Sequence, residues 1–310
     1  QPDSPQMDYD AMERAITSKT KAVIPVDLGG VICDYTRIFQ AAERQRDKFS
    51  VSASTELGER IQNGIGRVMV IADCAHAMGA KKKMEGSWKM AGNIADFSSF
   101  SFHAVKNLTT AEGGASAWKP VPGVDDEEIY KWFQLYSLHG QSKDAFSKMQ
   151  LGAWEYDIVA PFYKCNMADI MAAIGLKQLE RYGQLLERRR EVIEKYDEEC
   201  DKLGISHLAH YSDEMISSGH LYITRIPGIK DAQRREIILA MAGKGIACNV
   251  HYKPLPLMSG YKALGYHPEA YPNAFKYYEN EITLPLHTLL TDEDAEYVIQ
   301  QYINIVKGYL

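Results

Sequence analysis

The sequence lacks the features that mark several large classes of protein. Lys and Arg number 35 against 41 Asp and Glu, which gives a formal net charge of −6 without a long block of either sign. A mildly acidic chain of this kind is poorly suited to bind nucleic acid or an anionic membrane surface. No apolar run reaches the length of a transmembrane helix, and the first residues show no signal-peptide pattern. We therefore expect a soluble protein of the cytoplasm that binds neither nucleic acid nor membrane.

Cysteine patterns and common catalytic motifs are also missing. The five cysteines are scattered without a C-x-x-C pair, which argues against a disulfide framework and against a zinc ribbon. We find no G-x-G-x-x-G after a strand, no P-loop, no H-E-x-x-H and no G-x-S-x-G. His207 and His210 lie three residues apart, but no third type of metal ligand is near them. No metal is expected.

What the sequence does contain is an ordinary globular composition and an alternation of strand and helix patterns. Hydrophobic residues make up 45% and charged residues 25% of the 310 residues, a length that suggests about two domains. The continuous apolar run at 68–72 is typical of a strand buried on both faces of a parallel sheet. The patterns predict an α/β fold with a mostly parallel sheet flanked by helices. Expected helices lie at 8–16 and 38–46, and expected strands at 22–26, 68–72 and 97–102.

The later part of the chain has a different pattern. From Asp169, about thirty residues carry one apolar stripe of helical spacing, which predicts a long helix with a kink at Gly183. We further expect strands at 220–226 and 245–252 and helices at 231–244 and 291–309. This composition favours a smaller α+β domain. The predicted division is therefore a large domain over 1–182 and a C-terminal domain over 183–310.

Two charged residues follow predicted strands, where ligands bind in open α/β sheets. Asp73 ends the strand at 68–72, and Lys106 follows the strand at 97–102 and precedes Gly113 and Gly114. Pyridoxal phosphate needs a lysine for a Schiff base, an acid for its ring nitrogen and donors for its phosphate. Lys106, Asp73 and Ser101 could supply these groups. Alternatively, Asp73 caps the next turn and Lys106 pairs with a surface carboxylate.

Several segments resemble the DegT/DnrJ/EryC1/StrS family of sugar aminotransferases. They are VMVIADCAHAMGA at 68–80, SFHAVKNLTTAEGGA at 101–115, YKCNMADIMAAIGLKQLERY at 163–182 and NVHYKPLP at 249–256, and they occur in the family's order. The resemblance implies the aspartate-aminotransferase type of fold (fold type I of the pyridoxal phosphate enzymes). It also implies pyridoxal 5'-phosphate as cofactor and a homodimer with active sites at the subunit interface.

The resemblance also implies roles for individual residues. Lys106 would hold the cofactor covalently and move the proton between cofactor and substrate. Asp73 would pair with the pyridinium nitrogen, His76 would lie near the ring oxygen, and Ser101 would bind the phosphate. The alternatives are that Ser101 is only the polar side of a strand and that His76 is a core histidine.

Three further residues are implied by resemblance. Lys164 and Asn166 lie in a loop that, in the family, reaches the neighbouring subunit's phosphate site. Many relatives have Asn at the first of these positions, so which of the two makes the contact stays open, as does a plain surface role for Lys164. His251 lies in a loop that approaches the substrate in relatives, and a structural role is its alternative.

The chain departs from the family in two places. A polar insertion at about 44–66, with room for a short helix, either lines the substrate entrance or decorates the surface. Relatives also carry roughly a hundred residues before the point where this chain begins, including a glycine- and threonine-containing phosphate loop. We therefore expect this sequence to be a piece of a longer enzyme.

The function expected from the resemblance is transfer of an amino group from an amino acid, by family habit glutamate, to a keto-sugar that is nucleotide-linked. Such reactions serve polysaccharide or natural-product sugar biosynthesis. The alternatives are a dehydratase of the same family, a cyclitol aminotransferase and a non-catalytic fragment with the same fold. Relatives that are dehydratases typically have histidine in place of the Schiff-base lysine, whereas residue 106 is lysine.

Overall fold

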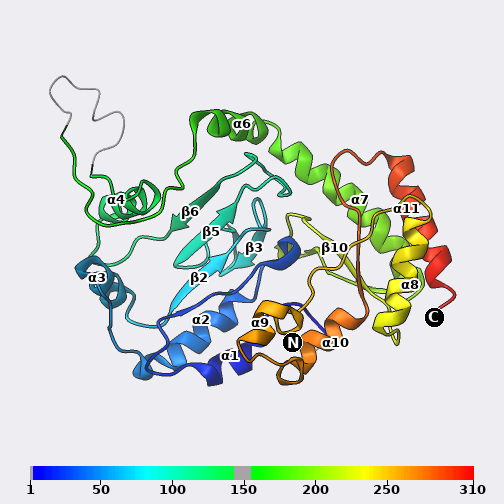
Figure 1. Ribbon diagram of the computed structural model, residues 1–310, viewed down its shortest axis with the longest axis horizontal. Coiled ribbons are helices and arrows are strands. Elements are labelled where there is room, and N and C mark those ends of the chain that lie inside the picture. Colours follow the sequence, from blue (N-terminus) through cyan, green and yellow to red (C-terminus); the bar gives the residue numbers. More distant parts are fainter. Residues whose placement is uncertain (1–2, 143–154) are drawn as a thin grey trace.

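A four-stranded sheet organises the first half of the computed structural model, which describes residues 3–142 and 155–310. Its order is β1-β2-β5-β6, with β1 at Ala22–Val23, β2 at Met69–Asp73, β5 at Phe97–Ser101 and β6 at Gly114–Trp118. β1, β2 and β5 are parallel, and β6 is antiparallel to β5. The predicted α/β fold with a mostly parallel sheet is thereby confirmed (Figure 1).

Strand β2 is less completely covered than its apolar sequence predicts. Val70 and Ala72 are buried, but the alternate residues Met69 and Ile71 are only half-buried. The expectation of burial on both faces is therefore wrong for the described residues. One face packs on helix α2 (Tyr35–Arg44), whose Tyr35, Ile38, Ala41 and Ala42 form a buried stripe. Helix α1 (Tyr9–Ala15) packs on α2 and completes this layer.

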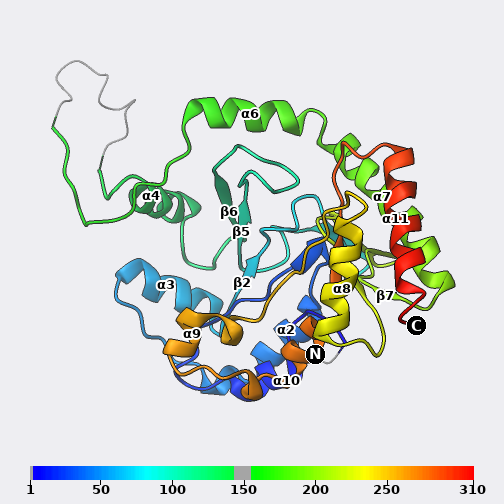
Figure 2. The same ribbon diagram turned by 45° about the vertical axis from the view of Figure 1, so that its right-hand side comes forward.

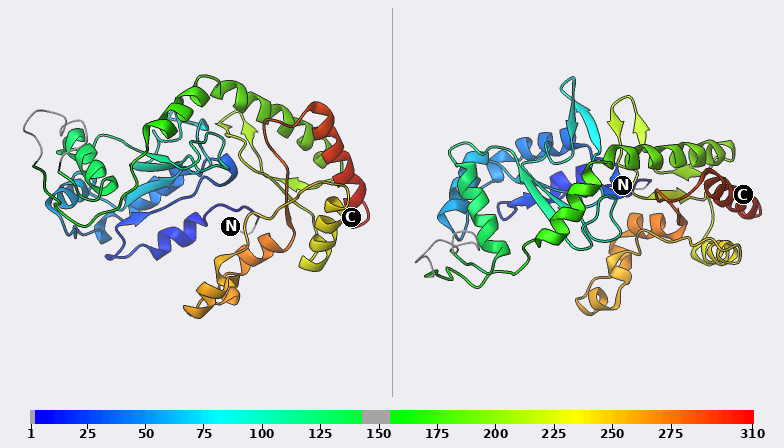
Figure 3. Two further views of the ribbon diagram at one scale, coloured as in Figure 1. Left: turned by 45° about the horizontal axis from the view of Figure 1, so that its top comes forward. Right: turned by 90° about the horizontal axis from the view of Figure 1, so that it is seen from above.

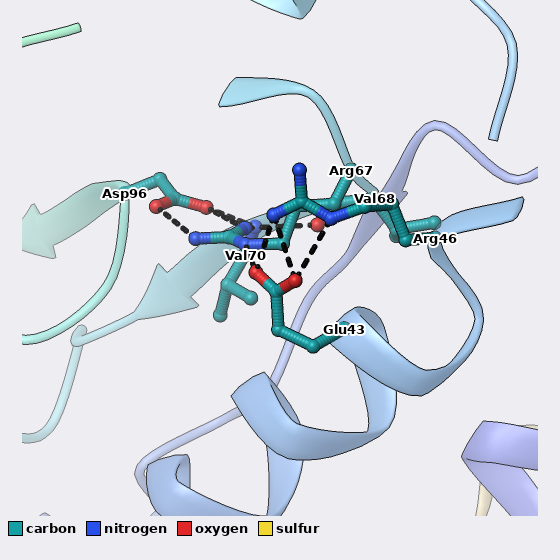
Figure 4. Close-up of polar contacts among 6 residues, drawn as sticks. All are labelled: Glu43, Arg46, Arg67, Val68, Val70 and Asp96. Atoms are coloured by element: carbon teal, nitrogen blue, oxygen red, sulfur yellow. Dashed lines mark hydrogen bonds and ion pairs between the residues drawn. The ribbon is translucent and has the colours of Figure 1, made fainter. Parts of the chain in front are cut away.

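An ion-pair cluster fixes the amino ends of β2 and β5. Arg67 donates two hydrogen bonds to the carboxylate of Asp96, at 2.7 and 2.9 Å, and a third to the carbonyl oxygen of Val68. Asp96 also accepts the N–H of Val70 at 2.8 Å, and Glu43 of α2 lies 3.2 Å from the Arg67 Nε (Figure 4). The cluster joins both strands at the end opposite Asp73, so it sets where their carboxyl ends lie.

The predicted insertion at 44–66 contains the expected short helix. Helix α3 (Glu56–Ile65) begins where the Thr55 side chain accepts the N–H of Gly58. It ends at Gly66, whose φ of 64° is a left-handed conformation that glycine adopts without cost. Its Arg60 forms an ion pair with Glu128 of helix α4 (Asp126–Ser137), so the insertion lies against α4.

The long helix predicted from Asp169 is two helices, α6 (Asp169–Leu179) and α7 (Tyr182–Lys202). The break is at Glu180 and Arg181, so the predicted kink at Gly183 is wrong in position. Tyr182 explains the difference, because its hydroxyl donates to the carbonyl oxygen of Met78 and its ring packs on Gly79. Figure 2 shows α6 leading into α7, which packs beside α11 (Asp292–Val306).

A second, three-stranded sheet organises the C-terminal part. Its order is β11-β10-β7, with β7 at Ser206–His207, β10 at Tyr222–Arg225 and β11 at Glu281–Leu284. Helices α7, α8 (Asp231–Ala242) and α11 bury their apolar faces in one core with these strands. The predicted strand at 245–252 is wrong, because Asn249 makes only an isolated bridge with Thr283.

Smaller elements complete the described residues. Strands β3 (Lys81–Met84) and β4 (Ser87–Met90) form a hairpin that pairs with β9 (Met215–Ile216) and β8 (Tyr211–Ser212). The segment with α9 (Ser259–Ala263) and α10 (Pro272–Glu279) projects away from the rest in both views of Figure 3. The remaining short elements are the 3₁₀ turns η1 (Leu28–Gly30), η2 (Arg46–Lys48), η3 (Leu255–Leu257) and η4 (Pro268–Ala270).

Two large apolar clusters divide the described chain. One draws all its buried members from residues 9–95, and the other draws its members from 192–306. The domain division at 182 and 183 stays a prediction, since the β3–β9 pairing also ties the two parts together. Across the described residues, no helix has both the length and the apolar character needed to cross a bilayer.

Candidate active site

The two residues at the centre of the sequence prediction lie at one edge of the sheet. Asp73 is the last residue of β2, and Lys106 lies in the loop that leaves the neighbouring parallel strand β5. The Lys106 N–H donates to the carbonyl oxygen of His103 at 2.9 Å, which holds the loop in a tight turn. Burial lowers the pKa of Lys106, and the nearby carboxylate of Asp73 opposes this by raising it. The two side chains are therefore close enough for the charge of Asp73 to affect the pKa of Lys106.

The alternatives for these residues have different outcomes. Asp73 does cap a turn, because its Oδ1 accepts the N–H of Ala75 at 3.0 Å. One carboxylate oxygen is thereby held in place while the other has no hydrogen-bond partner within 3–142 and 155–310. Lys106 makes no ion pair with a surface carboxylate in the same described ranges. Its amine lies in the site instead of pairing at the surface.

His76 is held as a neutral side chain of defined tautomer. Its ring is 8% exposed, and Nδ1 accepts the backbone N–H of Gly29 at 3.2 Å, so the ring proton resides on Nε2. Burial, with smaller contributions from Lys106 and His251, lowers its pKa to about 3. Nε2 lies 3.5 Å from the Tyr252 hydroxyl. His76 thus offers an N–H donor to the site.

Two glycines allow the chain to approach closely behind His76. Gly29 and Gly30 have φ of 66° and 91°, and a Cβ on Gly30 would lie 2.1 Å from the Ser218 Oγ. This approach lets the carbonyl oxygen of Gly29 accept the N–H of His220 at 2.9 Å. The Ser218 hydroxyl in turn donates to the carbonyl oxygen of His76. The glycine turn therefore joins the sheet to the loop at 217–220.

His220 connects that loop to Lys106. Its Nδ1 lies 2.9 Å from the Oδ1 of Asn107, the residue after Lys106, and the Asn107 amide donates to the carbonyl oxygen of Ser218. The His220 ring also lies against His76, with ring centroids 4.1 Å apart. Burial lowers the pKa of His220 to about 2, helped by His76, Arg189 and Lys106. Two neutral histidines therefore lie beside the lysine.

Asp27, which precedes the turn at Gly29 and Gly30, has a buried carboxyl group. Asp27 is 1% exposed and accepts the N–H of Cys33 at 2.9 Å and the hydroxyl of Tyr35 at 3.2 Å. Its backbone carbonyl oxygen accepts the N–H of Gly30. Burial raises the pKa of Asp27 to about 6 despite these hydrogen bonds.

Ser101 and His251 are held by different local contacts. Ser101 is the half-buried last residue of β5, and its hydroxyl oxygen accepts the N–H of His103 at 3.3 Å. His251 contributes a ring whose Nδ1 lies 2.9 Å from the Thr283 hydroxyl. Burial and the charge of Lys106 lower the pKa of His251, which brings this loop into the same electrostatic environment.

Lys164 and Asn166 do not lie with the other predicted residues. Both are exposed, and the Lys164 amine donates to the Oδ1 of Asn166. They belong to the segment before α6, whose Ile170 and Leu176 are 79% and 64% exposed. Within one chain, the described contacts give neither residue a partner at Lys106 or Asp73.

His207 and His210 are occupied by other interactions. The His207 nitrogens each lie 3.0 Å from a carboxylate oxygen, one of Asp197 and one of Asp201. The Asp197 interaction is the main cause that raises the pKa of His207 to about 9. The His210 Nδ1 lies 2.9 Å from the Ser217 hydroxyl.

The sequence prediction missed several residues of this site, namely Gly29, Asn107, His220 and Tyr252. Asn107 and Tyr252 directly follow residues that were singled out, so adjacency was a usable signal. No local pattern identifies His220, because its partner Asn107 lies 113 positions away.

The assembled groups fit pyridoxal phosphate. Lys106 could provide a partly desolvated amine for the aldehyde, Asp73 a carboxylate for the ring nitrogen and His76 an N–H donor. Ser101 adds a hydroxyl at the end of β5. An α/β sheet with a lysine and an acid beyond the carboxyl ends of adjacent strands is the arrangement expected of a pyridoxal-phosphate-dependent transferase.

The chain belongs to the DegT/DnrJ/EryC1/StrS aminotransferase family, whose model matches residues 1–67 and 61–302. It is 33% identical over 301 residues to the spore coat polysaccharide biosynthesis protein SpsC of Bacillus subtilis, covering 96% of this chain and 69% of SpsC. The family resemblance found in the sequence is therefore confirmed.

Solved structures give the same result. Spr1654 of Streptococcus pneumoniae, assigned as a sugar aminotransferase, superposes in its PMP form with a TM-score of 0.92 and 52% identity, over 100% of this chain and 75% of that one. PseC of Helicobacter pylori, an aminotransferase in pseudoaminic acid biosynthesis, gives a TM-score of 0.78 and 25% identity, over 98% and 71%. Spr1654 is also solved in a PLP form. The expected enzyme class and its cofactor, pyridoxal phosphate, are confirmed.

Proposed function

We propose that the chain transfers an amino group from an amino acid, with glutamate as donor, to a nucleotide-linked keto-sugar in the cytoplasm. The product would serve the biosynthesis of a polysaccharide or of a natural-product sugar. The names of the relatives support this substrate class, since SpsC acts in spore coat polysaccharide biosynthesis and PseC in pseudoaminic acid biosynthesis. The observation that carries the proposal is the position of Lys106 beside Asp73 at the ends of adjacent parallel strands.

Lys106 is the catalytic residue of this proposal. Bound pyridoxal phosphate supplies an aldehyde for covalent attachment and a ring that accepts electrons. Because burial lowers the pKa of Lys106, its Nζ loses a proton more readily than an exposed lysine does. The free amine is then able to take the α-proton of the amino acid and to return a proton to the sugar carbon that receives the nitrogen.

The other residues hold and polarise the cofactor. The Asp73 carboxylate would pair with the ring nitrogen, and its cap on Ala75 fixes the side chain for that contact. His76 would donate from Nε2 to the ring oxygen, since the Gly29 N–H occupies its Nδ1. Ser101 would bind the phosphate. His251 would contact the substrate from the loop at 249–252.

A second copy of the chain would complete the site. Lys164 and Asn166 would reach the phosphate of the neighbouring subunit, which accounts for their exposure in a single chain. They adjoin α6, where Ile170, Ala173 and Ile174 line an open groove of about 600 Å³. An exposed apolar helix next to the two polar residues supports a homodimer through this face.

The lysine assignment is tested by covalent trapping. Protein mixed with pyridoxal phosphate should absorb visible light, and borohydride reduction followed by peptide mass spectrometry should place the label on Lys106. The Lys106→Ala variant should lack the band, whereas the matched Lys202→Ala variant, at an exposed lysine of α7, should keep it. A label on another lysine would refute the assignment. A fully folded protein that never develops the band would favour the non-catalytic alternative.

The substrate class is tested in two half-reactions. Glutamate should bleach the visible band and release 2-oxoglutarate, and a nucleotide-linked keto-sugar should restore the band and yield an amino sugar by mass spectrometry. Restoration only by a keto-cyclitol, or loss of the sugar hydroxyl without gain of nitrogen, would support one of the alternatives instead.

Analytical ultracentrifugation of the wild type and of the Ile170→Asp variant tests the proposed homodimer. The variant places a charge on the exposed apolar face of α6, so it should weaken the dimer.

A further inference from the structure

A fully buried carboxyl lies behind the loop that carries His251. Glu281, the first residue of β11, is 0% exposed, and its two oxygens accept hydrogen bonds from different groups. Oε2 accepts the backbone N–H of His251 at 2.9 Å, and Oε1 accepts the hydroxyl of Thr283 at 2.6 Å. No cation forms an ion pair with Glu281 among the described residues. Its protonation state is therefore coupled to hydrogen bonds rather than fixed by a salt bridge.

The hydrogen bonds form a chain of defined direction. An ionised carboxylate only accepts, so the single proton of the Thr283 hydroxyl points toward Glu281. The Thr283 oxygen then has only lone pairs to offer the His251 Nδ1, which lies 2.9 Å away. Nδ1 must carry the imidazole proton. Nε2 has a free lone pair and no hydrogen-bond partner in the described part of the chain.

His251 also lines a cavity of about 420 Å³, together with Tyr252, Asn273 and Tyr277. A ligand that reaches Nε2 would meet either a lone pair or an N–H there, according to the direction of the hydrogen-bond chain.

We propose that Glu281 is a positioning residue that sets the tautomer of His251 through the Thr283 hydroxyl. With Glu281 ionised, His251 presents an acceptor at Nε2. With Glu281 protonated, the carboxyl donates to Thr283, the Thr283 hydroxyl donates to Nδ1, and the imidazole proton leaves Nδ1 while Nε2 takes one up from water. The ring stays neutral in both states, but Nε2 is an acceptor in one and a donor in the other.

The surrounding groups set the pH range in which Glu281 gains or loses its proton. Burial raises the pKa of Glu281 to about 7, against the hydrogen bonds from Thr283 and His251 and the charge of Arg234. Tyr277 of α10, Tyr302 of α11 and Tyr252 also interact with Glu281. Burial and Lys106 lower the pKa of His251, so this ring does not become a cation first. His76 and His220, the other rings near it, are neutral as well.

The consequence for catalysis rests on the proposed function, because it concerns a sugar or amino-acid group that reaches Nε2. An Nε2 acceptor favours a substrate hydroxyl or ammonium, whereas an Nε2–H favours a carboxylate or carbonyl oxygen. The tautomer itself is a property of the chain without substrate, so it is testable separately.

The test is nitrogen NMR of isotope-labelled histidine side chains in the cofactor-free protein, with His251 assigned by its loss in His251→Asn. In the wild type, the protonated nitrogen should be Nδ1 at about pH 8.5 and Nε2 at about pH 5.5. In Glu281→Gln, the amide N–H donates to Thr283 while its oxygen keeps the His251 N–H. Nε2 should then be protonated at both pH values.

Two matched variants control for structural damage. Thr283→Val should abolish the pH-dependent change because it removes the hydroxyl, and Thr283→Ser should retain it. Lys106→Ala should also retain the change, although it abolishes the proposed reaction, which separates failure of this inference from failure of the function. A wild-type tautomer that is constant with pH, or a Glu281→Gln variant that titrates like the wild type, would overturn the proposal.

Discussion

Replacing Asp96 by Ala should destabilise the protein much more than breaking an ion pair of the same chemistry at the surface. The Asp96 and Arg67 side chains are 10% and 13% exposed, and two parallel hydrogen bonds join them (Figure 4). Without Asp96, the guanidinium keeps Val68 and Glu43 as partners, but the N–H of Val70 loses its side-chain acceptor. The matched comparison is the bidentate pair of Arg60 with Glu128.

The magnitude follows from burial. Removing one member of a buried pair costs roughly 3–5 kcal/mol, because the remaining charge loses its compensation. Glu43 offsets part of that cost at Arg67, so we expect the free energy of unfolding to fall by about 3 kcal/mol for Asp96→Ala. The Arg60 and Glu128 side chains are 38% and 42% exposed, and water replaces the lost partner there. Glu128→Ala should leave the free energy of unfolding unchanged within error.

The assay is equilibrium unfolding in urea of the cofactor-free protein, followed by tryptophan fluorescence and circular dichroism. Coincident transitions are required before a free energy is extracted. The ratio of the two effects decides the outcome, since both variants remove a bidentate carboxylate. Equal losses for the two variants would refute burial as the reason that this cluster stabilises the strand ends.

Two other substitutions test the turn that supports His76. Gly30→Ala should cost more stability than Gly86→Ala in the same unfolding assay, because both have positive φ but only the Cβ at Gly30 meets an atom, at 2.1 Å. The shared conformational cost is roughly 1–2 kcal/mol, and the clash adds roughly 1–3 kcal/mol to it; similar losses would show that the approach to Ser218 is loose. Asp27→Asn should remove a loss of stability that the wild type shows as pH rises. The pKa of Asp27 is raised from 3.8 to about 6 in the fold, so its contribution is full below pH 3.8 and is lost through about pH 6. The difference between the two proteins should grow by about 2 kcal/mol between about pH 4 and about pH 7.5, and parallel pH profiles would contradict the raised pKa.

The placement of Asp73 and Lys106 at one edge of the sheet was predictable because its signals are local. An apolar run that ends at Asp73 and a strand pattern followed by Lys106 each mark a strand end in the sequence. The parallel pairing of β2 with β5 then brings these ends to one edge, as the general topology of α/β sheets requires. The prediction needed only strand positions and their direction.

The supporting residues were not predictable in this way. The Gly29 contact with His76 spans 47 positions, and the His220 contact with Asn107 spans 113. Such contacts depend on how the C-terminal part packs on the sheet, which no periodicity in either segment expresses. The strand expected at 245–252 failed for a related reason. After the bridge at Asn249, the N–H of His251 donates to the Glu281 side chain instead of continuing the ladder.

Burial is the main cause of the pKa shifts of the buried groups in this site. It disfavours the charged form of every group, so it lowers the pKa of Lys106, His76 and His220 and raises that of Glu281. Neutral histidines add no positive charge beside the lysine. The pKa of Lys106 is therefore set by desolvation, which lowers it, and by the Asp73 carboxylate, which raises it. A protonated histidine at either position would lower the lysine pKa further and would repel a cationic ring nitrogen. Burial therefore keeps both histidines neutral. Exposing them by loosening the turn at Gly29 and Gly30 would allow them to become protonated and would change the pKa of Lys106 as well.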